Sequence, residues 1–132
     1  MDRSDGARVL AVTRIVASAV AGCPFCIDMN AATWKRAGLT PGELRGLLSD
    51  PVAAVATLDA RSATAGKYAA ILSATPVVLD EGLRVELRER FSAREIVVLA
   101  TTIAQVNFWS RFSQGLGVPA AGFFDESECP VR

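Results

Sequence analysis

The amino-acid sequence predicts an all-α protein, folded as a compact bundle of about six helices. Alanine, the strongest intrinsic helix former, occurs 22 times among the 132 residues. No segment shows the alternation of apolar and polar residues between hairpin turns that is typical of strands. Hydrophobic residues make up 51% of the chain and charged residues 21%, a globular composition that can bury one core. We therefore expect a single domain over residues 1–132, of which residues 118–132 form a C-terminal tail.

Apolar residues at helical spacing, together with capping residues, divide the chain into six predicted helices. These cover residues 6–20, 23–37, 40–48, 59–73, 80–90 and 92–115, with a less regular segment at 52–58. Capping boxes begin the helices at Thr40 and Ser92, because each of these residues is followed three positions later by glutamate. Gly38 is expected to end the second helix, and Glu86 is expected to pair with Arg90 one turn later.

The last predicted helix carries two apolar faces. Ile96, Leu99, Ile103 and Val106 share one face, and Val97, Ala104, Phe108 and Phe112 share another. A surface helix of a monomer needs only one apolar stripe, so the second stripe predicts contact with another subunit. We therefore expect a homo-oligomer.

The charge balance and the lack of histidine exclude several classes of function. The 14 basic and 14 acidic residues give zero net charge, which argues against a nucleic-acid-binding protein. Without histidine, the chain has no histidine base and no histidine-ligated metal site. The uncharged stretch Ile96–Ser110 is shorter than the roughly 18 residues needed to span a bilayer. We expect a cytoplasmic protein that binds no metal, cofactor, membrane or nucleic acid.

The distinctive chemical feature is the sequence Cys23-Pro24-Phe25-Cys26 at a predicted helix start. Backbone N–H groups and the helix dipole stabilise a thiolate at that position, and two cysteines three apart can also close a disulfide. Two other interpretations stay open: half of a zinc site with Cys129 as a third thiol, or two inert buried cysteines. The pattern favours a redox pair, with Cys129 as an incidental thiol in the tail.

The residues around this pair resemble a known family. The segment 22–32, GCPFCIDMNAA, is similar to the core motif of the carboxymuconolactone decarboxylase family, in its alkylhydroperoxidase D-like branch. Residues 91–97, 107–112 and 116–119 resemble the C-terminal half of the family, so that the resemblance covers roughly residues 7–119. It implies an all-helical fold, assembly into trimers or hexamers, and an antioxidant peroxidase or disulfide reductase with a thiol electron donor. In that scheme Cys26 attacks the substrate and Cys23 resolves the intermediate.

The sequence departs from that branch at two positions of its proton relay. Asn30 stands where the branch has a histidine, and Ala11 stands where it has a glutamate. Asn30 lies one helical turn after Cys26 and shares its face, but asparagine cannot take a proton, so we expect weak peroxide turnover. Asp28 is expected to be a first-turn carboxylate that the helix dipole favours. The other candidate site residues are Arg14, Trp34, Tyr68 and Asn107.

Three functions are compatible with these observations. The leading hypothesis is a thiol-dependent oxidoreductase that acts on a small peroxide through the cysteine pair. The second is a non-redox enzyme on the same scaffold, which decarboxylates, isomerises or cyclises a small metabolite by positioning and electrostatics. The third is a catalytically inactive assembly module.

Overall fold

The computed structural model describes residues 3–128 of the chain, and this part is all-helical with no strand, as predicted. The elements are α1 (Arg3–Ala21), α2 (Pro24–Ala31), α3 (Pro41–Ser49), α4 (Pro51–Ala54), the 3-10 helix η1 (Val55–Thr57), α5 (Ala60–Leu72), α6 (Glu81–Arg90) and α7 (Ala93–Gly115). None of the helices described combines the length and the apolar character that crossing a membrane requires.

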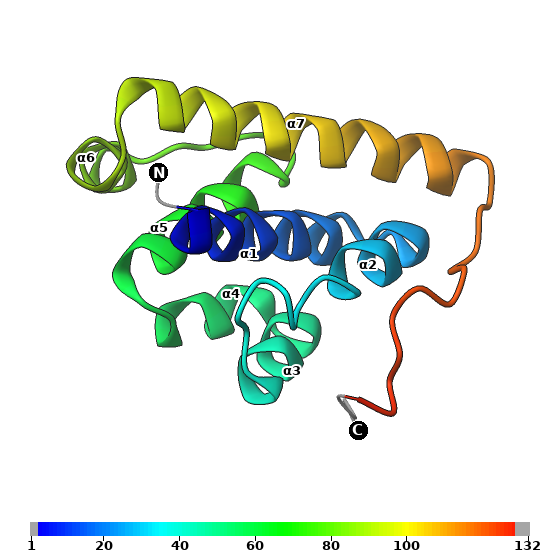
Figure 1. Cartoon of the computed structure of the whole chain (residues 1–132). Coiled ribbons are helices and arrows are strands. Elements are labelled where there is room, and N and C mark those ends of the chain that lie inside the picture. Colours follow the sequence, from blue (N-terminus) through cyan, green and yellow to red (C-terminus); the bar gives the residue numbers. More distant parts are fainter. Residues whose placement is uncertain (1–2, 129–132) are drawn as a thin grey trace.

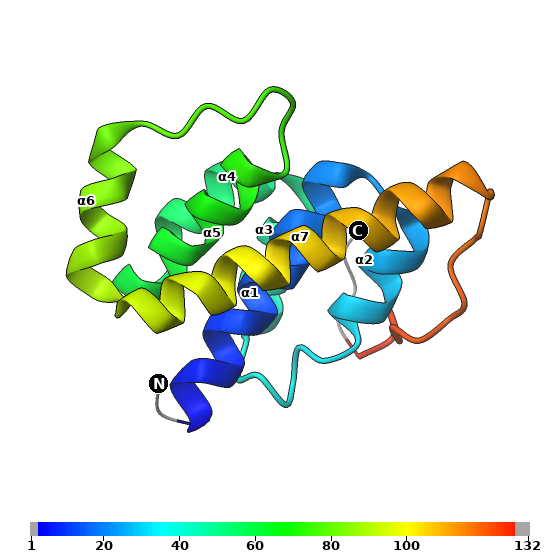
Figure 2. The same cartoon turned by 90° about the horizontal axis from the view of Figure 1, so that it is seen from above.

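Helix α1 lies in the middle of the bundle, between α7 on one side and α3 to α5 on the other (Figure 1). Its buried apolar residues include Val9, Val12, Ile15 and Val16. Gly66 lets α5 come close, because a Cβ at this position would collide with Val55 and touch Val12. Seen from above, α7 crosses over α1, and α2 packs against both helices (Figure 2). The three helices α1, α2 and α7 therefore meet at one end of the bundle.

The two capping boxes identified in the sequence are confirmed. Thr40 accepts the N–H of Glu43 while the Glu43 carboxylate accepts the N–H of Thr40, and Ser92 and Glu95 do the same at the start of α7. Each box satisfies two N–H groups that the first helical turn leaves unpaired. These caps define where α3 and α7 begin.

The second predicted helix is wrong in length, because α2 ends at Ala31 rather than Ala37. The N–H and the hydroxyl of Thr33 both donate to the carbonyl oxygen of Asn30, at 3.4 and 2.9 Å. The Asn30 carbonyl therefore accepts hydrogen bonds from Thr33, three positions later, instead of from the residue four positions later. This spacing tightens the chain into turns and ends the α-helix. The turns continue to Gly38, whose φ of +74° ends them.

The expected pairing of Glu86 with Arg90 is also wrong. The Glu86 carboxylate instead turns toward α5, where it accepts from the hydroxyl of Thr64 at 3.2 Å and pairs with Lys67 at 3.4 Å. Contacts between helices therefore replace the pair along α6.

The tail after α7 folds back over α2. Asp28 accepts hydrogen bonds from the backbone N–H groups of Ala121, Phe123 and Phe124, at 3.1, 3.0 and 2.8 Å. Lys35 pairs with Glu128 at 2.9 Å. The expectation that Asp28 serves the dipole of its own helix is wrong, because its carboxylate is directed at the tail. Cys129 lies outside the described residues.

Candidate active site

The cysteine pair lies at the junction between α1 and α2. Gly22 has a φ of +70°, a left-handed conformation that ends α1 and turns the chain. Cys23 then caps α2, and its Sγ accepts the backbone N–H of Cys26 at 3.3 Å. Both thiols are free, and their residues are 0% and 2% exposed. Two sulfur atoms of one helical turn are thus held in a buried setting.

The Cys26 thiol opens into a cavity. This cavity of about 240 Å³ lies where α1, α2 and α7 meet, and Cys26 lines it while Cys23 does not. Its other lining residues are Arg14, Met29, Asn30, Thr102, Gln105, Val106 and Trp109. Met29 and Trp109 are about half exposed, so the cavity is reached past their side chains. Cys26 is therefore the thiol that a small molecule in the cavity would meet.

The environment of Cys26 disfavours its thiolate. Its thiol pKa is raised to about 11, chiefly because burial disfavours the charged form. The hydrogen bond to Cys23 raises the pKa further, whereas the Ser110 hydroxyl lowers it. The expectation of a stabilised thiolate at this helix start is therefore wrong for Cys26. Removal from water outweighs the favourable dipole of a helix of eight residues.

Asn30 shares the Cys26 face of α2, as expected, and lines the same cavity. Its side-chain NH2 donates to the Ser18 hydroxyl at 2.7 Å, and Ser18 in turn donates to the carbonyl oxygen of Arg14 at 2.7 Å. This chain fixes the Asn30 amide against α1. The exposed guanidinium of Arg14 lines the cavity too, and it forms no ion pair within residues 3–128. Arg14 is thus a cation available to a ligand.

Three other predicted site residues lie away from this cavity. Trp34 is packed in the core, with the Lys35 ammonium 5.6 Å from its ring centroid. Tyr68 of α5 lines a different and smaller cavity, and burial raises its pKa. Asn107 donates to the Ser73 hydroxyl at 2.9 Å and to the Ile103 carbonyl at 3.0 Å, which ties α7 to the end of α5. The structure therefore brings together Cys23, Cys26, Asn30 and Arg14.

The contribution of α7 to the site was not predicted from the sequence. Thr102, Val106 and Trp109 follow one another at helical spacing along the cavity wall, and Ser110 lies beside Cys26. In the sequence, residues 96–110 form an uncharged stretch whose apolar faces predict subunit contact, with Asn107 as its one candidate site residue. Small hydroxyl residues within such a stretch, one turn from apolar core positions, are the signal that could have identified this wall.

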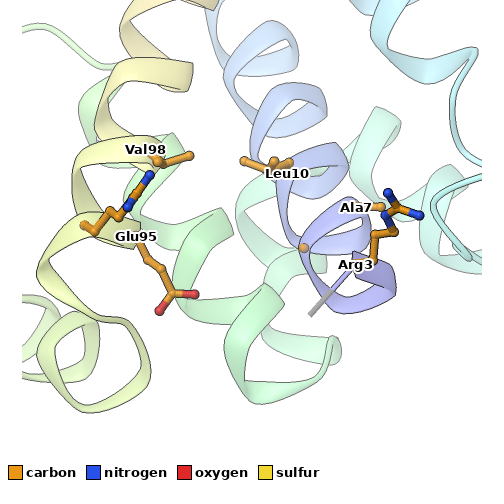
Figure 3. Close-up of a pocket in the computed structure, with 7 residues that line it drawn as sticks. Arg3, Ala7, Leu10, Glu95 and Val98 are labelled. Carbon is orange, nitrogen blue, oxygen red and sulfur yellow. The ribbon is translucent and has the colours of Figure 1, made fainter. Parts of the chain in front are cut away.

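A larger cavity lies elsewhere, and no thiol lines it. It measures about 430 Å³ and lies between the first halves of α1 and α7. Leu10 and Val98 face each other across it, and the Glu95 carboxylate lies near its lower end (Figure 3). Arg3, at the start of α1, also lines this cavity (Figure 3). Its largely apolar lining offers no thiol, and its Glu95 carboxylate is used by the N–H of Ser92 and by Arg61, so the cavity at Cys26 is the candidate active site.

The fold and the site define a class of helical protein with a buried pair of thiols beside a small cavity. Residues 7–66 match the model of the carboxymuconolactone decarboxylase family. This segment, which includes both motif cysteines and Asn30, is similar to that family, in agreement with the resemblance found in the sequence. Comparison with curated proteins and with solved structures gave no match. The assignment to the alkylhydroperoxidase D-like branch stays a prediction.

Proposed function

We propose that this protein is a thiol-dependent oxidoreductase that cycles Cys23 and Cys26 between a dithiol and a disulfide. The observation that supports this most directly is the pair of free thiols in one helical turn, of which Cys26 lines the cavity described above. Cys23 Sγ accepts the Cys26 N–H at 3.3 Å, and the Cys23 side chain also interacts with the Cys26 thiol and raises its pKa. An attacking thiol next to a substrate and a resolving thiol behind it are what a two-cysteine peroxidase needs.

The proposed reaction balances with an organic or inorganic peroxide as oxidant. The Cys26 thiolate attacks one oxygen of the O–O bond, forms an S–O bond and releases the other oxygen as an alkoxide, which takes a proton. Cys23 then attacks the sulfenic sulfur, and water leaves as the disulfide forms. An external dithiol reduces this disulfide and restores both thiols. A reducing compartment such as the cytoplasm would keep the pair ready.

The remaining residues of the cavity fit a small substrate. A volume of about 240 Å³ admits a short molecule rather than a long chain. The Arg14 guanidinium supplies positive charge next to the thiol, and the Asn30 amide can orient a substrate oxygen without taking a proton. Positioning and charge would thus stand in for the missing base.

The raised pKa of Cys26 makes the expected rate low. With a pKa of about 11, about one thiol in ten thousand is ionised at pH 7. Because the thiolate is the nucleophile, peroxide turnover should rise about tenfold for each pH unit between pH 7 and pH 9. A rate at pH 7 equal to that of efficient thiol peroxidases would contradict this account.

Thiol titration before and after peroxide treatment tests the proposal. In the wild-type protein, peroxide should remove two titratable thiols, and mass spectrometry should find a disulfide between Cys23 and Cys26. Cys26→Ser should abolish this loss, while Cys129→Ser, the matched control, should leave it unchanged. If Cys23 and Cys26 alkylate fully after peroxide in a folded protein, the proposal is wrong.

A non-redox enzyme is the second candidate, and the raised pKa of Cys26 favours it. A thiol that stays protonated can serve as part of a cavity wall, while Arg14, Asn30 and Gln105 bind a small carboxylate. Calorimetric titration with short dicarboxylates separates the candidates. Binding that is lost in Arg14→Gln, in a protein whose thiols resist peroxide, would support this second function.

A further inference from the structure

Ser110 is a buried polar residue that the fold does not explain. Its residue is 0% exposed, and its hydroxyl has no hydrogen-bond partner within residues 3–128. Most buried polar groups in native proteins are paired, so an orphaned hydroxyl needs a reason. The side chain does not bond back to its own helix, as Thr102 does to the carbonyl oxygen of Val98. The hydroxyl is therefore available to form a hydrogen bond with a neighbouring group.

The position of Ser110 on α7 identifies that neighbour. Ser110 follows Val106 by four residues, and Val106 lines the same cavity as Cys26, so both side chains share the face of α7 that meets α2. One turn further along this face, the Gln114 side chain donates to the carbonyl oxygen of Ala21 at 3.0 Å, two residues before Cys23. Ser110 thus lies between a residue that lines the Cys26 cavity and a residue that contacts the α1–α2 junction, and its hydroxyl lowers the pKa of the Cys26 thiol. No hydrogen bond between Ser110 and another group competes for this hydroxyl in the described part of the chain.

We propose that Ser110 donates a hydrogen bond to the thiolate form of Cys26 and so stabilises the nucleophile. A thiolate accepts hydrogen bonds strongly, whereas a protonated thiol accepts them weakly. The hydroxyl therefore gains its partner when Cys26 ionises. Since Asn30 cannot act as a base, this donor from α7 supports the thiolate in place of a proton relay. This inference rests on the proposed function, because it assigns a role at the same thiol.

Few charged groups compete with Ser110 for influence on Cys26. Arg14 reaches the cavity from α1, and Cys23 lies behind Cys26 at the start of α2. The wall that α7 contributes is uncharged, with Thr102, Gln105 and Ser110 as its polar members. Asp28, the acidic residue of α2, is directed at the tail. Replacing Ser110 therefore disturbs no ion pair, so a change in the reactivity of Cys26 can be attributed to the lost hydroxyl.

The pH dependence of Cys26 alkylation tests this role. The alkylation rate by iodoacetamide, measured between pH 7 and pH 9.5 with fragment ions that separate Cys23 from Cys26, should follow the thiolate fraction. In Ser110→Ala the rate at Cys26 should fall about tenfold at each pH, because losing the donor raises the thiol pKa by about one unit. Plots of the logarithm of the alkylation rate against pH should be parallel for the wild type and the variant.

Ser62→Ala is the matched control. The Ser62 hydroxyl is also buried and unpartnered in the described structure, but it belongs to α5. Both variants remove an orphaned hydroxyl and should fold with at least wild-type stability, and Ser62→Ala should leave the Cys26 rate unchanged. An unchanged or faster rate in Ser110→Ala, or an equal loss in Ser62→Ala, overturns the inference.

The outcome is separable from that of the proposed function. If Ser110→Ala slows alkylation while peroxide oxidises neither variant nor wild type, the role of Ser110 stands and the peroxidase proposal fails. If peroxide oxidises the pair while Ser110→Ala alkylates like the wild type, the reverse holds.

Discussion

Two groups of aromatic side chains lie on the surface of this protein. In one, the tail of the chain packs over Phe25, although Phe123 of the tail is itself 55% exposed, and in the other no such contact covers the rings within residues 3–128. On α2, Phe25 packs edge to face against Phe123 of the tail, with ring centroids 6.1 Å apart. On α7, Phe108 lies 5.0 Å from Trp109 and 6.3 Å from Phe112, centroid to centroid, and these rings contact each other. Phe108, Trp109 and Phe112 are still 61%, 53% and 51% exposed.

The difference lies in how the two groups are held. The tail is fixed over Phe25 by the three backbone hydrogen bonds to Asp28, so a specific anchor accompanies the aromatic contact. The α7 group has no such cover within residues 3–128. Monomers rarely expose contiguous apolar patches of this kind without a use for them. We infer that a second copy of the chain covers the α7 group, and the family resemblance favours a trimer or a hexamer.

Breaking the α7 group should have the largest effect. Light scattering at micromolar concentration should give a mass several times the 14.0 kDa of one chain. Phe108→Glu should reduce it to about one chain, because a carboxylate buried without a partner costs more than a lost aromatic contact. Circular dichroism should show that the helices remain, since Phe108 is 61% exposed in the single chain.

Val52→Glu is the control for Phe108→Glu. Val52 of α4 is 64% exposed, so the same charge enters a similarly exposed apolar position on another helix. The mass should not change in this variant. A wild-type mass near one chain would contradict the inferred assembly.

Releasing the tail should have the next largest effect. Asp28→Ala removes a charged acceptor of three backbone hydrogen bonds. A hydrogen bond to a charged group contributes about 1.5–3 kcal/mol to stability. We expect the free energy of unfolding in urea to fall by about 2 kcal/mol. Cleavage by a glutamate-specific protease at Glu126 should become faster. Glu89→Ala, which removes a carboxylate with no hydrogen bond or ion pair in the described structure, should change neither.

Acid should abolish the contribution of Asp28. Burial alone would raise the pKa of this carboxyl, but the N–H groups of the tail outweigh burial and lower the pKa below its usual range. A lowered folded pKa gives stability that is complete above the unfolded value of about 3.9 and is lost as the pH falls through the folded value. The stabilities of wild type and Asp28→Asn should therefore differ at pH 7 and converge in strong acid. Curves that stay apart below the folded pKa would contradict this anchor.

Local signals in the sequence predicted most of the fold. Capping boxes define helix starts through neighbouring residues, so Thr40 and Ser92 could be interpreted correctly. The length of α2 could not, because it depends on which group Thr33 binds. The partner of Glu86 depends on the packing of α6 against α5, which no local pattern contains.

The site shows the same division. The motif identified Cys23 and Cys26, and helical spacing placed Asn30 on the face of Cys26. The pKa of Cys26 was mispredicted because burial depends on α7, which is distant in sequence. The role of Asp28 as an anchor depends on residues more than 90 positions away. The sequence pattern therefore predicted the two cysteines but not their surroundings.

The smallest expected effect concerns the aromatic contact between α2 and the tail. The rings of Phe25 and Phe123 meet at 79°, an edge-to-face geometry worth about 0.5–1.5 kcal/mol beyond the area it buries. A double-mutant cycle with Phe25→Leu and Phe123→Leu isolates this term, because leucine keeps an apolar side chain at both positions. The two losses in unfolding free energy should sum to about 1 kcal/mol more than the loss in the double variant. Chain concentration must be equal throughout, since assembly adds to apparent stability.

The same cycle built on Asp28→Ala shows whether the anchor and the rings act together. If Asp28 holds the tail in place, the coupling between Phe25 and Phe123 should vanish once Asp28 is replaced, because the released ring no longer meets its partner. A coupling that persists in the Asp28→Ala background would mean that the aromatic contact holds the tail by itself. The surface on α2 would then be covered by apolar contact alone, as we infer for the α7 group. The two surfaces would differ only in that the tail of the same chain covers one and a second copy of the chain covers the other.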